Sequence, residues 1–230
     1  MSGNKNLDKI IVMLTNNDVT VENAYEVFDA CKDLPIKNWG FKDVGLPRQK
    51  AKELAEYMKQ CGKTTTLEVV TYTEEGGLDG AKMAVECGMD HLSGALPYPS
   101  LISYAKEHNL QFMPFVGNVG GSPVELHGTL ESILAQEKEL AEAGIQAVDL
   151  LIYRYMDGDQ EQFAEAYFKH AALPAVIAGS VGNEERIRRV LSLGAQAFTM
   201  GSALFKKNFV RNGTFRDNLE AVIRILETID

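Results

Sequence analysis

Two glycine-serine pairs, separated by one predicted helix and strand, are the residues of this chain that most directly indicate chemistry. Within residues 174–205, Gly179-Ser180 ends one short apolar run and Gly201-Ser202 ends the next. Unpaired backbone N–H groups in such loops, together with the helix expected to begin at Ser202, can bind a phosphate dianion. A single pair is usually only a turn between a strand and a helix, but two consecutive pairs predict one shared phosphate site.

A lysine and a glutamate on neighbouring predicted strands form the second candidate. Strand side chains alternate between two faces, so Lys42 and Glu68 should point into the interior if their apolar neighbours face the helices. Those neighbours are Trp39, Phe41, Leu67 and Val69. An ammonium beside a carboxylate suits proton transfer next to a carbonyl, or Schiff-base formation by a lysine whose pKa is lowered by burial. The alternative is an interior ion pair without a catalytic role.

Other polar residues are weaker candidates. His91 is a further catalytic candidate, although a lone histidine near an interior is more often part of the core. Arg154 ends the sixth predicted strand, where its planar guanidinium suits an anionic substrate, whereas Asp149 lies too early in that strand for easy access. Asn16 suits a sugar hydroxyl or a turn, and Asp43 would reach a substrate only if its strand end curls inward.

The composition restricts the expected cofactors, partners and location. The sequence contains no HExxH, CxxC, clustered acidic or GxGxxG motif, so we expect neither a metal nor a cofactor. Its three cysteines lack metal-ligand spacing, and an odd count suits a reducing compartment. The net charge of −9 disfavours a nucleic-acid partner. The polar N-terminus and the lack of a long apolar run predict no signal peptide, no membrane partner and a cytoplasmic location.

The alternation of strand-like and helix-like segments predicts a (β/α)₈ TIM barrel as a single domain of residues 1–230. The chain is 45% hydrophobic, which is enough to fill such a core. The expected strands are residues 9–15, 38–43, 64–71, 90–95, 111–117, 146–154, 174–180 and 196–200. The glycine-rich residues 118–128 interrupt the rhythm and predict a mobile lid or an ordinary long loop. An open doubly wound sheet is the alternative fold, although it usually has fewer strands.

The two glycine-serine pairs of residues 174–205 resemble the phosphate loops after strands seven and eight of the ribulose-phosphate-binding barrels. The resemblance implies a small phosphorylated substrate and an isomerase, epimerase or aldolase activity, by proton transfer or Schiff-base chemistry. The Asp-x-Lys-x-x-Asp pattern of the decarboxylases is absent from the third strand, whereas Lys42 and Glu68 are similar in kind to the lysine and glutamate of epimerases that act on phosphorylated amino sugars. The layout is also similar to the glycerol-uptake antiterminator regulators, so a non-catalytic phosphometabolite sensor is the alternative. The sequence is compatible with a homodimer.

Overall fold

Eight parallel strands form the centre of the protein, which was analysed as a computed structural model that describes residues 5–229. The strands are β1 (Ile10–Met13), β4 (Asn38–Lys42), β5 (Thr64–Val69), β6 (His91–Gly94), β7 (Gln111–Met113), β10 (Val148–Leu150), β11 (Ala175–Ile177) and β12 (Ala197–Met200). They are hydrogen-bonded in the order β10-β11-β12-β1-β4-β5-β6-β7. The two ends of this sheet meet where Phe115 forms a parallel bridge with Asp149, whose N–H also donates to the Pro114 carbonyl (2.8 Å). The expected barrel is therefore confirmed.

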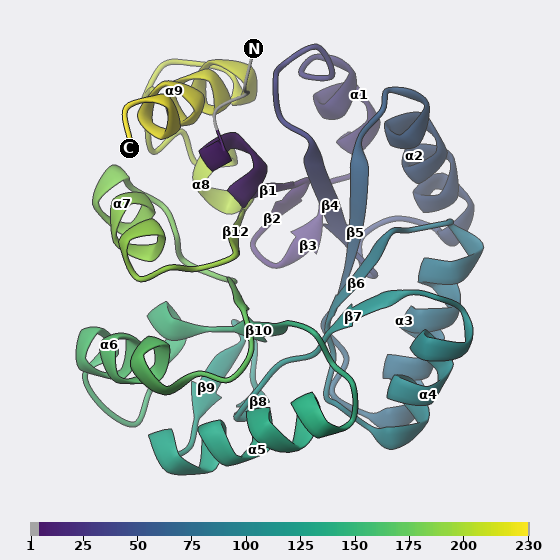
Figure 1. Ribbon diagram of the computed structural model, residues 1–230. Coiled ribbons are helices and arrows are strands. Elements are labelled where there is room, and N and C mark those ends of the chain that lie inside the picture. Colours follow the sequence, from purple (N-terminus) through teal and green to yellow (C-terminus); the bar gives the residue numbers. More distant parts are fainter. Residues whose placement is uncertain (1–4, 230) are drawn as a thin grey trace.

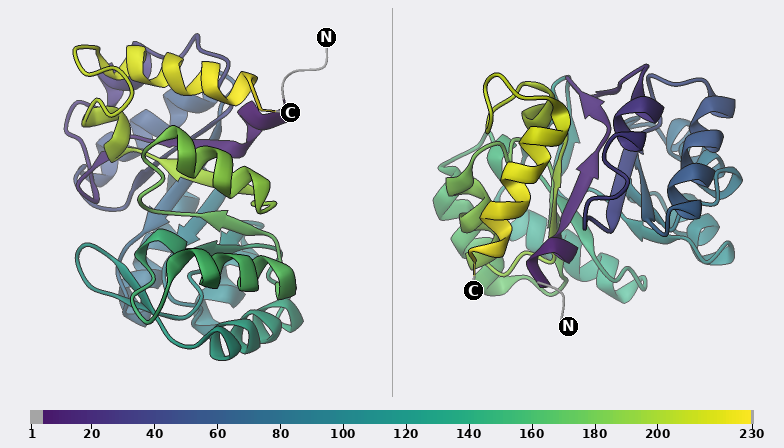
Figure 2. Two further views of the ribbon diagram at one scale, coloured as in Figure 1. Left: turned by 90° about the vertical axis from the view of Figure 1, so that its left-hand side faces the viewer. Right: turned by 90° about the horizontal axis from the view of Figure 1, so that it is seen from above.

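Helices surround the ring of strands, as Figure 1 and the two further views in Figure 2 show. They are α1 (Ala24–Asp29), α2 (Arg48–Gln60), α3 (Glu74–Glu86), α4 (Pro99–Glu107), α5 (Leu130–Glu142), α6 (Gln160–His170), α7 (Glu184–Ser192), α8 (Ser202–Phe205) and α9 (Phe215–Glu227), with the 3-10 helices η1 (Lys5–Lys9) and η2 (Ile152–Arg154). A side-chain oxygen accepts from an N–H of the first turn in several of them, and the capping residues are Thr73, Thr129, Asp159, Asn183 and Thr214. These caps explain why the helices begin directly after the loops at the strand ends.

The strands separate two apolar cores. The larger core lies between the strands and the helices, and it includes the four side chains predicted to face outward, Trp39, Phe41, Leu67 and Val69. Trp39, for example, packs edge-on against Phe28 of α1 with ring centroids 5.1 Å apart. A smaller buried cluster consists of Ile11, Met13, Met113, Ala147, Val176 and Ala197. Because side chains alternate along each strand, this second cluster fills the interior of the barrel.

Two short hairpins leave the barrel at the carboxyl ends of β1 and β7. The first pairs β2 (Thr15–Asn16) with β3 (Val19–Thr20), which the sequence did not predict. The second pairs β8 (Asn118–Gly120) with β9 (Glu125–His127), so the predicted lid or loop is an antiparallel hairpin.

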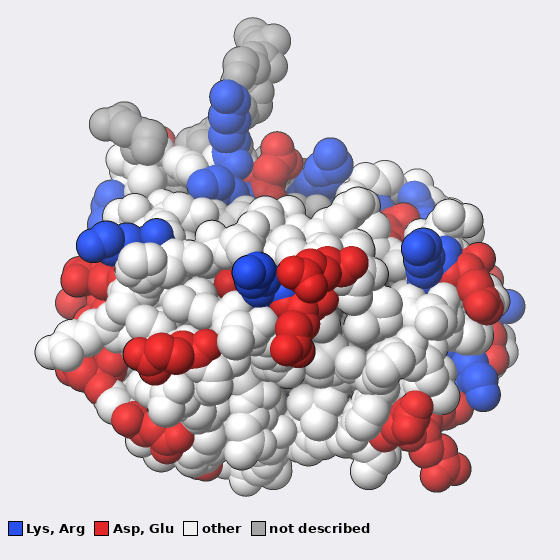
Figure 3. All heavy atoms as spheres, turned by 60° about the horizontal axis from the view of Figure 1, so that its bottom comes forward, with Lys and Arg blue, Asp and Glu red and all other residues white. Residues whose placement is uncertain are grey.

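Neither a membrane-spanning helix nor a basic stripe is seen in the part of the chain that the structure describes and on the face that Figure 3 draws. No helix within residues 5–229 is both long and apolar enough to cross a bilayer. On the face drawn in Figure 3, basic side chains are scattered among acidic ones and do not form a continuous stripe.

Candidate functional site

A cavity of about 730 Å³ opens among the loops that follow the carboxyl ends of the strands. Its lining includes all four residues of the predicted phosphate site, Gly179, Ser180, Gly201 and Ser202. Lys42, Glu68 and Arg154 line the same cavity. Seven of the ten residues predicted from the sequence to form a site therefore share one space, and the loops of β11 and β12 lie on one side of it.

The loop after β11 presents unpaired backbone N–H groups. Gly179 and Ser180 both adopt left-handed backbone conformations, with φ of 74° and 61°. Within the described part of the chain, the N–H groups of Ser180, Val181 and Gly182 donate no hydrogen bond. Consecutive N–H groups of this kind form a concave site for an anion.

The loop after β12 lies close to the first hairpin. A Cβ added to Gly201 would lie 2.6 Å from both the carbonyl oxygen and Oγ1 of Thr15, so only glycine fits there. The Oγ of Ser202 accepts a hydrogen bond from the Asn17 N–H (2.9 Å). Asn208, which follows α8, connects this part of the chain to the loop after β11, because its Nδ2 donates to the Gly182 carbonyl (3.0 Å).

Two cations lie on the same side as these loops. Arg186 donates to the Ser180 carbonyl (2.6 Å), and its guanidinium carbon lies 4.2 Å from the centroid of the Tyr153 ring. Lys206, which also lines the cavity, follows α8. The charged groups of the cavity lining are the cations Lys42, Arg154, Arg186 and Lys206 and the carboxylates Asp18 and Glu68. The lining is therefore positive overall, in a chain whose net charge is −9.

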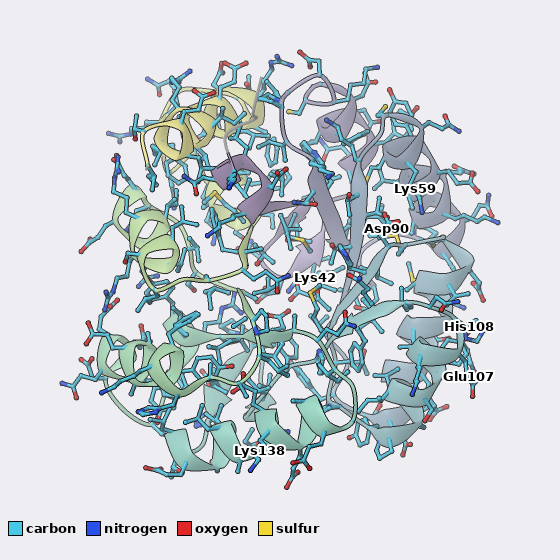
Figure 4. The ribbon with its side chains drawn as sticks, in the orientation of Figure 1. Lys42, Lys59, Asp90, Glu107, His108 and Lys138 are labelled. Atoms are coloured by element: carbon cyan, nitrogen blue, oxygen red, sulfur yellow. The ribbon has the colours of Figure 1, made fainter. Side chains whose placement is uncertain are left out.

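Four of these charged groups form a network at the inner end of the cavity. The Nζ of Lys42 lies 2.9 Å from Oδ1 of Asp18 and 3.2 Å from Oε1 of Glu68. Arg154 contacts the same Asp18 carboxylate through NH1 (3.2 Å) and NH2 (3.4 Å). Lys42 and Glu68 are each only 4% exposed, and Figure 4 shows Lys42 inside the ring of strands. The predicted ion pair thus exists, and its catalytic role stays a prediction.

The network changes the expected protonation of Lys42. Burial by itself would lower the pKa of Lys42, but the charges of Glu68 and Asp18 outweigh it and raise that pKa. The pKa of Asp18 is lowered, because the charges and hydrogen bonds of Lys42 and Arg154 outweigh the effect of its burial. The prediction of a lysine with a lowered pKa was therefore wrong, since it counted one carboxylate partner where the fold supplies two.

A second acidic group is buried in the barrel interior. Asp149 of β10 is fully buried, and neither carboxylate oxygen has a hydrogen-bond partner among the described residues. The hydroxyl of Ser93 on β6 is likewise buried without a partner in that part of the chain. Burial, followed by the charge of Glu68, raises the pKa of Asp149 well above its usual value. Burial in the barrel therefore favours the neutral, protonated form of Asp149 over its carboxylate.

The structure places three predicted site residues outside this cavity. His91 begins β6 and lines a different cavity of about 710 Å³, together with Asn38 and Gln111 at the amino ends of their strands. The strand registers place Ser93 beside Glu68, so His91 lies two residues nearer the amino end of the barrel than the Lys42–Glu68 pair. Asp43 accepts a hydrogen bond from the Val70 N–H (3.2 Å), and its pKa rises to about 6, mainly through burial.

Asn16 is the third of these residues. It lies in the strand before the first hairpin turn and is absent from the cavity lining, whereas the next two residues, Asn17 and Asp18, line the cavity. The hairpin turn thus places Asp18, and not the predicted Asn16, at the cavity. Sequence analysis missed Asp18, although an Asn-Asp pair is a recognisable signal for a two-residue hairpin turn with positive φ. Both residues have positive φ, 50° and 62°.

The site shows no arrangement that would hold a metal. Within residues 5–229, no group of three His, Cys, Asp or Glu side chains is placed to bind a metal ion.

Comparisons with known proteins support the fold at the level of three-dimensional structure. No protein-family model matches the chain, and no curated protein matches its sequence. A solved 4-hydroxy-2-oxoglutarate and 2-dehydro-3-deoxyphosphogluconate aldolase superposes with a TM-score of 0.64 at 14% identity, covering 98% of this chain and 99% of that one. An N-acetylmannosamine-6-phosphate 2-epimerase from Clostridium perfringens gives 0.63 at 13% identity, covering 91% and 95%.

A regulatory protein shares the same architecture. The glycerol uptake operon antiterminator regulatory protein of Listeria monocytogenes superposes with a TM-score of 0.58 at 14% identity, covering 84% of this chain and 91% of that one. These likenesses confirm the (β/α)₈ barrel fold. At such low identity they show the fold alone.

Proposed function

We propose that this protein binds a small phosphorylated metabolite in the main cavity and transfers a proton next to the carbonyl group of that metabolite, as an isomerase, epimerase or aldolase. One observation carries the proposal. The cavity has unpaired N–H groups and two cations, Arg186 and Lys206, at one side, and the buried Lys42–Glu68 pair at its inner end. A phosphate group bound by the N–H groups and the two cations would direct the rest of a small molecule toward the Lys42–Glu68 pair.

The phosphate would bind to the loop after β11 and to the loop after β12. The free N–H groups of Ser180, Val181 and Gly182 would donate to its oxygens. Arg186 and Lys206 would neutralise the dianion from the rim of the cavity. The names of the aldolase and the epimerase with the same fold refer to phosphorylated compounds, which agrees with this ligand class.

The charge state of the inner pair favours proton transfer over Schiff-base chemistry. A raised pKa keeps Lys42 an ammonium, which is not nucleophilic but can stabilise negative charge on a carbonyl oxygen. The Glu68 carboxylate would take the proton from the carbon next to that carbonyl, and the electron pair of the broken C–H bond would form an enolate. Delivery of a proton to the opposite face of the same carbon would complete an epimerisation. Delivery to the neighbouring carbon, with transfer of the hydroxyl proton from that carbon's oxygen to the former carbonyl oxygen, would complete an isomerisation.

Isotope exchange tests this function without a known substrate. The protein is incubated in D₂O with a panel of phosphorylated ketoses and amino sugars, and deuterium on carbon is followed by NMR. We expect exchange in at least one compound, and no exchange with Glu68→Gln. Borohydride is added in a parallel series, because reductive trapping of a lysine adduct would show Schiff-base chemistry instead. Binding of panel compounds without exchange, product or adduct would reject the catalytic part of the proposal.

A non-catalytic sensor of a phosphometabolite is the second candidate. The observation that favours it is the complete pairing of Lys42 with two carboxylates, which suits a structural ion pair as well as a reactive one. The antiterminator regulatory protein also has this fold, with a TM-score of 0.58. If the protein is a sensor, binding of a panel compound would raise the thermal unfolding temperature of the protein, and the compound would remain unaltered in D₂O.

A further inference from the structure

The carboxylate of Asp18 occupies the space between the two cations at the inner end of the cavity. It lies 2.9 Å from Nζ of Lys42 and 3.2 Å from NH1 of Arg154. The two carboxylates, Asp18 and Glu68, together balance the two positive charges. The inner end of the cavity is therefore neutral overall, whereas Arg186 and Lys206 make the outer end positive.

The position of Asp18 is held by contacts on both sides of the hairpin turn. Before it, the Asn17 N–H donates to Oγ of Ser202 in the phosphate loop (2.9 Å). After it, Oγ1 of Thr20 accepts from the N–H of Lys42 (2.8 Å) and donates to the carbonyl of Lys42 (2.9 Å). The hairpin is thus tied to the phosphate loop and to β4, and its tip cannot move away without breaking these bonds.

We propose that Asp18 determines specificity by excluding ligands that carry a second anionic group. A carboxylate or second phosphate at the inner end would find Lys42 and Arg154 already neutralised and would meet the charge of Asp18. A hydroxyl or carbonyl group would find both hydrogen-bond donors and acceptors there. The ligand class is therefore a phosphate monoester whose other end is neutral and hydroxylated. This inference rests on the proposed phosphate site, and it adds that the inner end of the same cavity selects against ligands with a second anionic group.

Asp18→Asn is a conservative test of this role. Asparagine tolerates the positive φ of 62° and has the same shape, so the hairpin turn should persist. The substitution removes one negative charge and leaves Lys42 and Arg154 with only Glu68 as a counter-charge. The inner end would then attract an anion.

A matched pair of ligands measures the selection directly. Glycerol 3-phosphate and 3-phosphoglycerate share one skeleton and differ by a hydroxymethyl group against a carboxylate. Their affinities are measured by calorimetry at low ionic strength, with inorganic phosphate as a reference for the outer end. The natural protein should bind glycerol 3-phosphate more tightly, and Asp18→Asn should shift the ratio toward 3-phosphoglycerate about tenfold or more. Asp79→Asn, an equal charge change on the exposed face of α3, should leave the ratio unchanged.

Each outcome is decisive. A natural protein that prefers 3-phosphoglycerate would show that the ligand displaces Asp18, and would overturn the inference while supporting the phosphate site. An unchanged ratio in a folded Asp18→Asn would also overturn it. If Asp18→Asn does not fold, the preference of the natural protein still decides. If no phosphate ester and no inorganic phosphate binds to the natural protein, both the proposed function and this inference are wrong.

Discussion

The ammonium of Lys42 lies 3.2 Å from the carboxylate of Glu68 because the register of β4 and β5 pairs these two residues directly. Both side chains point into the barrel, where each is almost completely buried. Removing either partner would leave the other charge buried without its counterpart. The Lys42–Glu68 pair therefore affects the stability of the fold and is also the proposed centre of the chemistry. Four measurements test this pair, the outer end of the cavity, Gly201 and Asp149.

The pair itself is tested by Lys42→Met and Glu68→Gln. Either change should lower the rate of deuterium exchange by a factor of about 10² or more, because the proton acceptor or the charge that stabilises the enolate is lost. Affinity for inorganic phosphate, for which we propose a site at the outer end, should change little with Glu68→Gln. His91→Gln is the matched control, because His91 also belongs to a barrel strand but lines the cavity at the opposite end. Equal loss of exchange in all three variants would argue against the assignment.

The outer end is tested by Lys206→Gln. Lys206 lines the cavity, so its loss should weaken binding of inorganic phosphate several-fold at low salt, and added salt should reduce the difference. Lys207→Gln provides a control with the same charge change one residue further along, outside the described lining of the cavity. Calorimetric titration of each variant with inorganic phosphate measures the two affinities. Equal weakening by the two substitutions would mean that only the general charge of the protein matters.

Gly201 is expected to contribute to the stability of the fold as well as to the site. A Cβ there would lie 2.6 Å from the Thr15 carbonyl oxygen and 2.9 Å from that of Met13, so the backbone must shift. We expect Gly201→Ala to lower the free energy of unfolding by about 1–3 kcal/mol. Gly120→Ala, where an added Cβ meets nothing within 4 Å, should change stability far less. Denaturant unfolding of the two variants gives the comparison, and an equally stable Gly201→Ala would contradict the close approach of the two backbones.

Asp149 predicts a pH dependence of stability. Its raised pKa means that the folded protein keeps a proton which the unfolded chain releases above about pH 4. The free energy of unfolding of the natural protein should therefore fall, relative to that of Asp149→Asn, as the pH rises from about 4 toward the pKa of the folded state. Denaturant unfolding of both proteins between pH 4 and pH 8 measures this difference. A difference that stays constant with pH would show that Asp149 ionises alike in the folded and unfolded chains.

Much of the fold followed from local patterns in the sequence. Apolar runs at strand spacing, the polar residues that cap the helices, and the two glycine-serine pairs depend on interactions within a few residues. The side of each strand that faces the helices was also predictable, because alternation is a local property of an extended chain. These patterns were enough to predict a barrel and to place Lys42 and Glu68 in its interior.

Only the tertiary structure decided which of the predicted residues meet in the site and which residues join them. Asp18 reaches Lys42 and Arg154 through a hairpin turn, and Arg154 is 136 positions away in the sequence. His91 faces inward as expected, but its height in the barrel depends on where β6 begins relative to its neighbours. Distances between side chains of different strands, and therefore their pKa values, are set by strand register and loop direction. Those depend on the packing of the whole barrel, which no local pattern encodes.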